Sequence, residues 1–362
     1  MSSRARWTAG HDRLCQGPIK GIGSASYALA RLSEARLVDP GQAARFLEST
    51  GLADFAWQAT WAVAVGSQPA DGLAQADGCV VLIHGWDGSR AIWEDIPARI
   101  CLGNPRLFVL APDVNGFGGS PFADTLPSLA TCAPVAVMRA VEGWTELLGL
   151  RSGPRAHSRY RVLTFVGHSM GGAATFYLTE GRWRPHEVAR LAVAPALLLN
   201  DMLRQEFYKA LGLSIWAGSP AKALDWLKDW LAPRLIESLI GDASQTVKDE
   251  HLRIFNSTPR GTLAQTFYAM GAAPQPVPRR RWQHFRVLLG HRDRLVGVAP
   301  MLLLLEKLGF VSDCIDVVLG DHYLFSVGRK SRRLHTPNRD LLVRRVLELH
   351  QECRQAQRGQ AR

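Results

Sequence analysis

Short apolar runs recur along the chain and alternate with segments of helical spacing. Each run has the length and continuity expected of a strand that is buried on both faces. They cover residues 79–83, 107–111, 162–166, 188–194, 284–289 and 314–319. Helical spacing is clearest over residues 136–150, where Val137, Val141, Trp144 and Leu148 share one side. Strands that alternate with helices in this way predict an α/β fold, with a mostly parallel central sheet and helices on both faces.

Two segments interrupt this alternation. Residues 1–52 precede it, and we expect a mainly helical extension with helices over 25–35 and 41–49, followed by a strand over 57–65. Residues 198–280 have several helical stretches, no convincing strand and a proline-rich end, which predicts an inserted helical lid over one end of the sheet. The predicted organisation is an extension (1–52), a core (53–197 and 281–350), a lid (198–280) and a basic C-terminal tail (351–362).

Composition narrows the class of protein. A chain of 362 residues with 47% hydrophobic and 21% charged residues is ordinary for a soluble domain of this size. The longest apolar run, residues 191–199, is about half of the roughly 20 residues that a membrane span needs. No apolar segment near the N-terminus resembles a secretory signal. The six cysteines are scattered without a C-x-x-C pair, so we expect reduced thiols, a cytoplasmic location and no metal site.

The positive charge is concentrated near the C-terminus. Of the net charge of +11, most comes from residues 329–362, and Arg279, Arg280 and Arg281 form a smaller cluster. A basic helix could contact RNA, an acidic partner or an anionic surface. No recognition motif accompanies the charge. A solvated terminal helix is the simpler interpretation, and we expect no nucleic-acid partner.

A serine stands between two glycines at the end of the third buried run, in Gly167-His-Ser-Met-Gly171. The glycines permit a tight strand-to-helix turn that exposes the hydroxyl of Ser169 and directs the N-terminus of the helix toward whatever it attacks. The pattern G-x-S-x-G is common by chance, and a serine that only caps the helix would look the same. Its setting between a strand and a helix favours a nucleophile.

Such a nucleophile needs a base from another strand end. Of the eleven histidines, His322 follows the last predicted strand and is placed best, with His291 second. His84 and His168 lie in tight turns, and His284 opens a strand at the other end of the sheet. The other histidines lie in polar or terminal segments and are expected to be solvated: His11, His157, His186, His251, His335 and His350.

An imidazole base needs a carboxylate that orients it. Asp293 follows the strand before that of His322, although it could also cap the next helix or pair with a neighbouring arginine. Asp321 is a weaker candidate because it is adjacent to His322. The order Ser169, Asp293, His322 then matches the nucleophile–acid–histidine order of the α/β-hydrolases.

Further motifs extend this similarity. The first buried strand ends in Leu82-Ile-His-Gly-Trp86, and the second in Ala111-Pro-Asp-Val-Asn-Gly-Phe-Gly-Gly-Ser120. With the serine turn and the segments ending in Asp293 and His322, the sequence resembles the α/β-hydrolase fold family, in its serine-nucleophile, esterase- or lipase-like branch. The resemblance covers about residues 78–196 and 284–350.

The resemblance implies roles for individual residues. Ser169 would be the nucleophile, His322 the general base and Asp293 the orienting acid. The backbone N–H groups of Trp86 and Met170 would form the oxyanion hole. These loops would be supported by His84, Gly85, Gly167 and Gly171. The proposed reaction would need no metal and no organic cofactor.

We therefore expect a serine hydrolase that cleaves an ester, lactone, thioester or amide with an apolar group. Candidate pocket residues are Trp86, His168, Trp216, Trp226 and Trp230, although the last three could equally form the packing of the lid. An acyltransferase or a C–C bond hydrolase would use the same parts. A non-catalytic binding protein on this fold and an RNA-associated protein remain alternatives from other classes.

Overall fold

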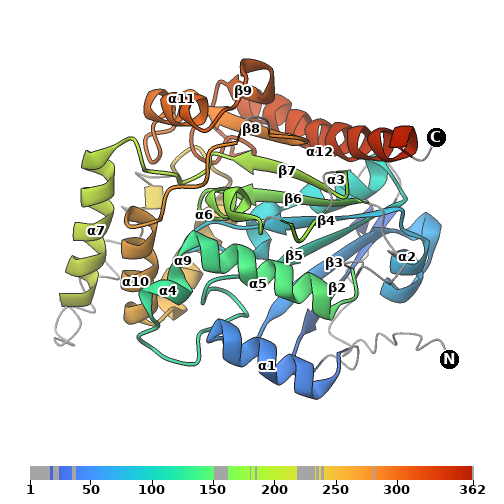
Figure 1. Ribbon diagram of the computed structural model, residues 1–362, viewed down its shortest axis with the longest axis horizontal. Helices are drawn as coiled ribbons and strands as arrows, with labels where there is room; N and C mark the ends of the chain where they lie inside the picture. The colour runs from blue at the N-terminus through green and yellow to red at the C-terminus, as the bar shows by residue number, and fades with distance from the viewer. Residues whose placement is uncertain are drawn as a thin grey trace.

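Figure 1 shows the computed structural model of the protein. The described residues are 17–18, 24–34, 38–150, 162–179, 181–183, 186–217, 233, 236–237, 240–279 and 282–360.

Within these residues, one nine-stranded sheet runs through the molecule. The strand order is β1 (Gly17–Pro18), β2 (Ser24–Arg31), β3 (Ala56–Ala62), β5 (Leu107–Pro112), β4 (Gly78–Ile83), β6 (Val162–His168), β7 (Val188–Val193), β8 (Phe285–Gly290) and β9 (Ile315–Val318). The pairs from β1 to β5 are antiparallel, and those from β5 to β9 are parallel. Every residue of β4, β5, β6 and β7 is buried, as their apolar runs predicted. The α/β prediction is confirmed.

The N-terminal extension differs from its prediction. The expected helix over 25–35 is wrong: β2 lies there and pairs with β3 from Ala25 to Arg31. The helix expected over 41–49 is present as α1 (Pro40–Thr50), which begins after an Asp39 cap that accepts the N–H of Gln42 at 2.9 Å. The strand expected over 57–65 ends earlier, and a 3₁₀ turn, η1 (Val63–Val65), follows it. The described strands of the extension, β1 and β2, therefore belong to the sheet.

Helices cover both faces of the sheet (Figure 1). On one face, α5 (Pro134–Leu147), α6 (Met170–Ala174) and α11 (Val298–Lys307) join α1 around a large apolar core. There Trp144 packs against Phe55 and Trp57, with ring centroids 5.3 and 5.5 Å apart. On the other face, α3 (Ile96–Gly103) and α12 (Arg332–Gln360) form a second core. Two short helices, α2 (Pro69–Gln75) and α4 (Leu129–Cys132), lie in the connections.

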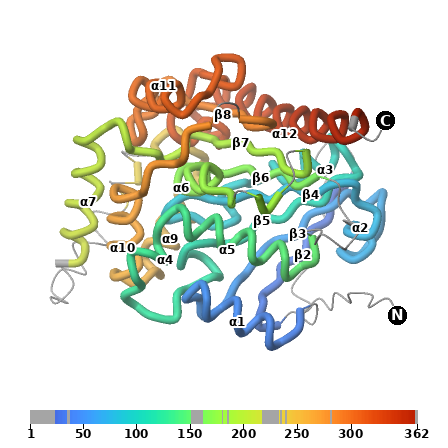
Figure 2. The backbone as a smooth tube through the Cα atoms, viewed as in Figure 1, coloured from blue at the N-terminus to red at the C-terminus, as the bar shows by residue number. Residues whose placement is uncertain are grey.

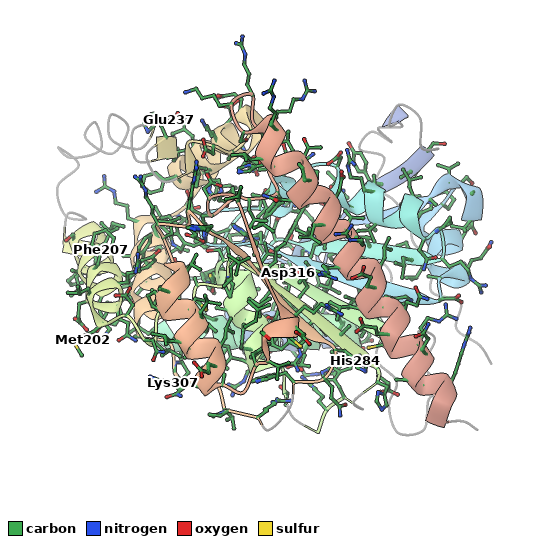
Figure 3. All side chains as sticks on the ribbon, turned by 90° about the horizontal axis from the view of Figure 1, so that it is seen from above. Met202, Phe207, Glu237, His284, Lys307 and Asp316 are labelled. Atoms are coloured by element: carbon green, nitrogen blue, oxygen red, sulfur yellow. The ribbon has the colours of Figure 1, made fainter. Side chains whose placement is uncertain are left out.

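The predicted basic tail over 351–362 is mostly helix. Helix α12 continues to Gln360, and it buries Leu342, Val346, Leu349 and Cys353 on one side. Figure 2 shows this red helix along the opposite side of the molecule from α1, and Figure 3 shows it crossing the sheet.

Several of its basic residues are bonded to the body of the protein. Arg345 holds Asp316 at 2.7 Å, Arg354 holds Asp77 at 2.7 Å, and Arg339 reaches Asp95 at 2.6 Å. Part of the C-terminal charge thus holds α12 against the body of the protein. Among the described helices, none has the length and apolarity required to cross a bilayer.

The described part of the insertion includes α7 (Met202–Ala217), α9 (Gln245–Ser257) and α10 (Arg260–Gly271). Helices α7 and α10 approach each other closely at Gly212. A Cβ at this position would lie 2.7 Å from the Ala264 carbonyl oxygen. Figure 1 places these helices beyond one end of the sheet, beside α6. The inserted helical lid is therefore present at the end of the sheet where α6 begins.

Candidate active site

The serine turn is a strained backbone between β6 and α6. Ser169 has a φ of 54° and a ψ of −116°, a conformation that L-residues rarely adopt and that positions them at functional turns. A Cβ on Gly167 would lie 2.1 Å from the Gly171 carbonyl oxygen, and one on Gly171 would lie 2.3 Å from that of Ile83. Only glycine fits at either position, so the predicted supporting role of both is explained by the close approach of strand and helix.

His322 and Asp293 meet behind this turn. The Nδ1 atom of His322 lies 2.8 Å from Oδ2 of Asp293, and both residues are buried. The other carboxylate oxygen accepts the N–H groups of Leu295 and Val296 at 2.9 and 3.1 Å. Asp293 is thus fixed by its own turn. When Nδ1 donates to this carboxylate, Nε2 of His322 is the unprotonated nitrogen, as a general base requires.

The two weaker candidates lie elsewhere. Asp321 accepts the N–H of Tyr323 at 2.9 Å and lies 3.7 Å from Nε2 of His335. Burial raises the pKa of Asp321. His291 is exposed on the surface, whereas His322 is 4% exposed. The arrangement therefore pairs His322 with Asp293.

The loop after β4 approaches the serine from the other side. A Cβ on Gly85 would lie 2.8 Å from Cβ of Ser169, so this backbone is in contact with the turn. Nε2 of His84 accepts the N–H of Val114 at 2.9 Å, which assigns the ring proton to Nδ1, 2.7 Å from the Gly85 carbonyl oxygen. Burial lowers the pKa of His84 and favours this neutral form. His84 thus fastens the Gly85 loop to the loop after β5.

The predicted oxyanion donors border this contact. Met170 is the first residue of α6, where a backbone N–H has no partner inside the helix. Trp86 follows Gly85 directly. The oxyanion role of both N–H groups stays a prediction.

The loop after β5 is held by a buried carboxylate. Asp113 accepts the backbone N–H groups of Arg90 and Gly119, both at 2.7 Å, and forms an ion pair with the Arg90 side chain. Ser120, at the end of the same motif, accepts the N–H of Ala56 at 2.8 Å. This motif therefore supports the loops around the site and has no place in the cavity itself.

A narrow cavity of about 80 Å³ opens onto Ser169 and His322. Its lining is mostly apolar and aromatic, with a polar part. It consists of Trp86, Asp87, Ser169, Tyr208, Ile236, Ile240, His251, Phe267, Met270, Leu295, His322 and Tyr323.

Of the predicted pocket residues, Trp86 lines this cavity. Its Nε1–H donates to Oγ1 of Thr266 at 2.9 Å, and its ring meets that of Phe267 at 4.3 Å, so it also packs against the insertion. His168 is fully buried behind the serine, where Nε2 lies 3.0 Å from the His322 carbonyl oxygen. It supports the His322 loop and does not line the cavity.

Trp216, the predicted tryptophan of the insertion that falls within the described residues, is not among the residues that line the cavity. Trp216 lies on α7 and is 51% exposed. Figure 3 shows Met202 and Phe207 of the same helix at the edge of the molecule. Trp226 and Trp230 lie outside the described residues.

Three histidines differ from the solvated positions expected for them. His251, His335 and His350 are buried, not solvated. His251 was recognisable in principle: on α9 it is four residues after Val247 and three before Ile254, both of which are buried. The polar residues next to it in the sequence made the buried face of α9 difficult to recognise. Asp87, Tyr208 and Tyr323, which also line the cavity, were not predicted.

Comparison with known proteins agrees with the fold. Residues 80–327 match the sequence profile of the Alpha/beta hydrolase family, and the chain belongs to this family. A search of curated protein sequences gives no match.

Several solved structures share the fold at low identity. An esterase from Exiguobacterium antarcticum superposes with a TM-score of 0.56 at 13% identity, over 80% of this chain and 96% of that one. A thermophilic esterase from Thermogutta terrifontis gives 0.54 at 14% identity, over 83% and 94%. A 2-hydroxy-6-oxo-6-phenylhexa-2,4-dienoate hydrolase from Rhodococcus sp. strain RHA1 gives 0.54 at 18% identity, over 82% and 95%.

Proposed function

We propose that the protein is a serine hydrolase that cleaves a carboxylic ester, or a related lactone, thioester or amide. The observation that carries the proposal is the contact of 2.8 Å between His322 and Asp293, on the same cavity as a serine held in a strained turn. A small-molecule substrate fits a cavity of this size. The membership of the hydrolase family supports the class of reaction.

In the proposed reaction, Nε2 of His322 removes the proton of the Ser169 hydroxyl as Oγ attacks the carbonyl carbon. The negative charge that develops on the carbonyl oxygen is stabilised by the N–H groups of Met170 and Trp86. His322 then protonates the leaving group, and the acyl group remains on Ser169. Water repeats the sequence, which releases the acid and restores the hydroxyl.

The lining of the cavity favours a small apolar acyl group. Trp86, Phe267, Met270 and Leu295 line the same cavity as Ser169, and its volume is only about 80 Å³. We expect short-chain esters to be cleaved faster than long-chain ones, because a long acyl chain would have to displace these side chains.

The test is labelling with a fluorophosphonate probe, combined with hydrolysis of p-nitrophenyl esters of increasing chain length. We expect the wild-type protein to be labelled at Ser169, and Ser169→Ala to lose labelling and at least about 10⁴-fold in kcat. The matched control is Ser214→Ala, an exposed serine on α7, which should behave as wild type. Ester hydrolysis that persists in Ser169→Ala, or a wild-type protein that takes no label, would refute the proposal.

A further inference from the structure

Three polar side chains from separate parts of the chain meet in the wall of the cavity. Asp87 lies in the loop after β4, His251 belongs to α9 of the insertion, and Tyr323 directly follows His322. Nε2 of His251 lies 2.5 Å from the Tyr323 hydroxyl, and Nδ1 lies 3.5 Å from Oδ2 of Asp87. All three are at most 5% exposed. Polar groups this deeply buried are costly unless they are bonded to one another.

The proton positions in this cluster follow from its chemistry. Burial, followed by the charges of Asp87 and Asp321, raises the pKa of Tyr323 well above its ordinary value, so its hydroxyl keeps its proton. The hydroxyl can then donate to Nε2 of His251, which leaves the N–H at Nδ1 directed at the carboxylate of Asp87. His251 therefore interacts with one side chain on each side of the active site.

Other polar contacts fix α9 to the same two loops. Glu250 accepts a hydrogen bond from the hydroxyl of Ser89, two residues after Asp87. At the start of α9, Ser244 donates its N–H to Oγ of Ser326 at 3.0 Å and its hydroxyl to Glu94 at 2.6 Å. The helix is thus attached to the loop after β4 and to the loop that carries His322.

We infer that His251 is a positioning residue that links the loop of Trp86 to the loop of His322. This inference rests on the proposed function. Asp87 is adjacent to Trp86 and Tyr323 is adjacent to His322, so the two contacts of His251 constrain the spacing between the proposed oxyanion donor and the proposed base. The backbone of Asp87 has a φ of 56°, and such a conformation persists only where surrounding contacts hold it. His251 supplies one of those contacts.

The first test measures kcat and KM for p-nitrophenyl acetate in three variants and a control. His251→Phe and Tyr323→Phe each remove the hydrogen bond, and His251→Gln keeps an amide that can reach Tyr323. We expect the two phenylalanine variants to lose about 10- to 100-fold in kcat with KM within about threefold, and His251→Gln to recover part of the loss. Because both act on one contact, the double variant should be no slower than the slower single variant. Asp249→Ala, exposed on the same helix, should retain wild-type kcat.

The second test does not depend on activity. Hydrogen exchange of the peptides covering 84–90 and 320–326 should be faster in His251→Phe than in wild type, and unchanged in Asp249→Ala. If His251→Phe folds poorly, the milder Tyr323→Phe should show the same increase in exchange.

Wild-type kcat together with wild-type exchange in both phenylalanine variants would overturn the inference while leaving the proposed function intact. A wild-type protein that is not labelled at Ser169 would overturn the proposed function, and exchange alone would then decide whether His251 links the loops.

Discussion

At the scale of single residues, strained backbone is concentrated along one edge of the sheet. Four neighbouring strands, in the order β5, β4, β6 and β7, are each followed within a few positions by a non-glycine residue with positive φ. These residues are Asn115, Asp87, Ser169 and Ala194, with φ of 59°, 56°, 54° and 44°. Asparagine and aspartate adopt positive φ more readily than other residues, whereas for Ser169 and Ala194 such a conformation costs on the order of 1–3 kcal/mol. Strain of this kind at adjacent strand ends marks the edge where the site lies.

The role of Asp293 leads to a prediction at this scale. In Asp293→Asn the shape of the side chain is kept, but the amide no longer favours the tautomer with the proton on Nδ1. The proton then resides on Nε2, and His322 cannot act as a base. We expect kcat for a p-nitrophenyl ester to fall by about 10⁴-fold, the size of effect known for this change in a serine protease triad, with little change in thermal stability.

Asp321→Asn is the matched comparison, since Asp321 is adjacent to His322 but faces Tyr323 and His335. It should reduce kcat far less than Asp293→Asn does. The opposite ranking of the two variants would assign the orienting acid to Asp321.

At the scale of elements, β2 shows where the hydrophobic pattern is insufficient. The central strands were predictable because each is a continuous apolar run buried on both faces. The segment Ser24–Arg31 has three alanines and one leucine, which favour a helix. It forms a strand because it pairs along its length with the distant β3 and, at its start, with β1. As with the central strands, the positions of Ser169, Asp293 and His322 could be predicted, because each of these residues follows a strand. The spacing of α9 could have marked His251 as buried, but not as part of the cavity, because its place there depends on how the insertion packs on the core.

The pairing of β2 with β3 predicts different effects of proline at adjacent positions. Leu32 donates its N–H to the Phe55 carbonyl oxygen at 2.8 Å, and the register continues to Ala28 opposite Ala59. Because an antiparallel ladder alternates, the N–H of Ala28 is directed toward β3 and that of Leu29 away from it. Ala28→Pro should therefore lower the free energy of unfolding by about 1–3 kcal/mol more than Leu29→Pro does. Urea denaturation measures this difference. Equal losses at both positions would be the result expected of a helix, and would contradict the strand.

At the scale of the whole molecule, the long helix α12 brings an unusual group into the second core. His350 is 2% exposed and lies against the start of β4, where a Cβ on Gly78 would be 2.0 Å from its ring. Among the described residues, neither ring nitrogen of His350 has a hydrogen-bond partner. Burial, reinforced by the charge of Arg354 and opposed by that of Asp77, lowers its pKa from 6.5 to about 4. The fold therefore contains a histidine that must be neutral.

This histidine couples global stability to pH. In the unfolded chain His350 binds a proton near pH 6.5, whereas in the folded protein it does so only near pH 4, so its contribution is complete above pH 6.5 and is lost as the pH falls toward 4. The shift corresponds to about 3 kcal/mol. His350→Leu removes the proton site. Between pH 7 and pH 4, the free energy of unfolding measured in urea should therefore fall by about 3 kcal/mol less in this variant than in the wild type.

The control is His291→Leu, at an exposed position, which should keep the pH dependence of the wild type. His84 and His168 also have lowered pKa values, but both are present in all three proteins. The difference in pH dependence between His350→Leu and the wild type therefore reports on His350 alone. An unchanged pH dependence in His350→Leu would show that α12 does not hold this ring in a dry environment.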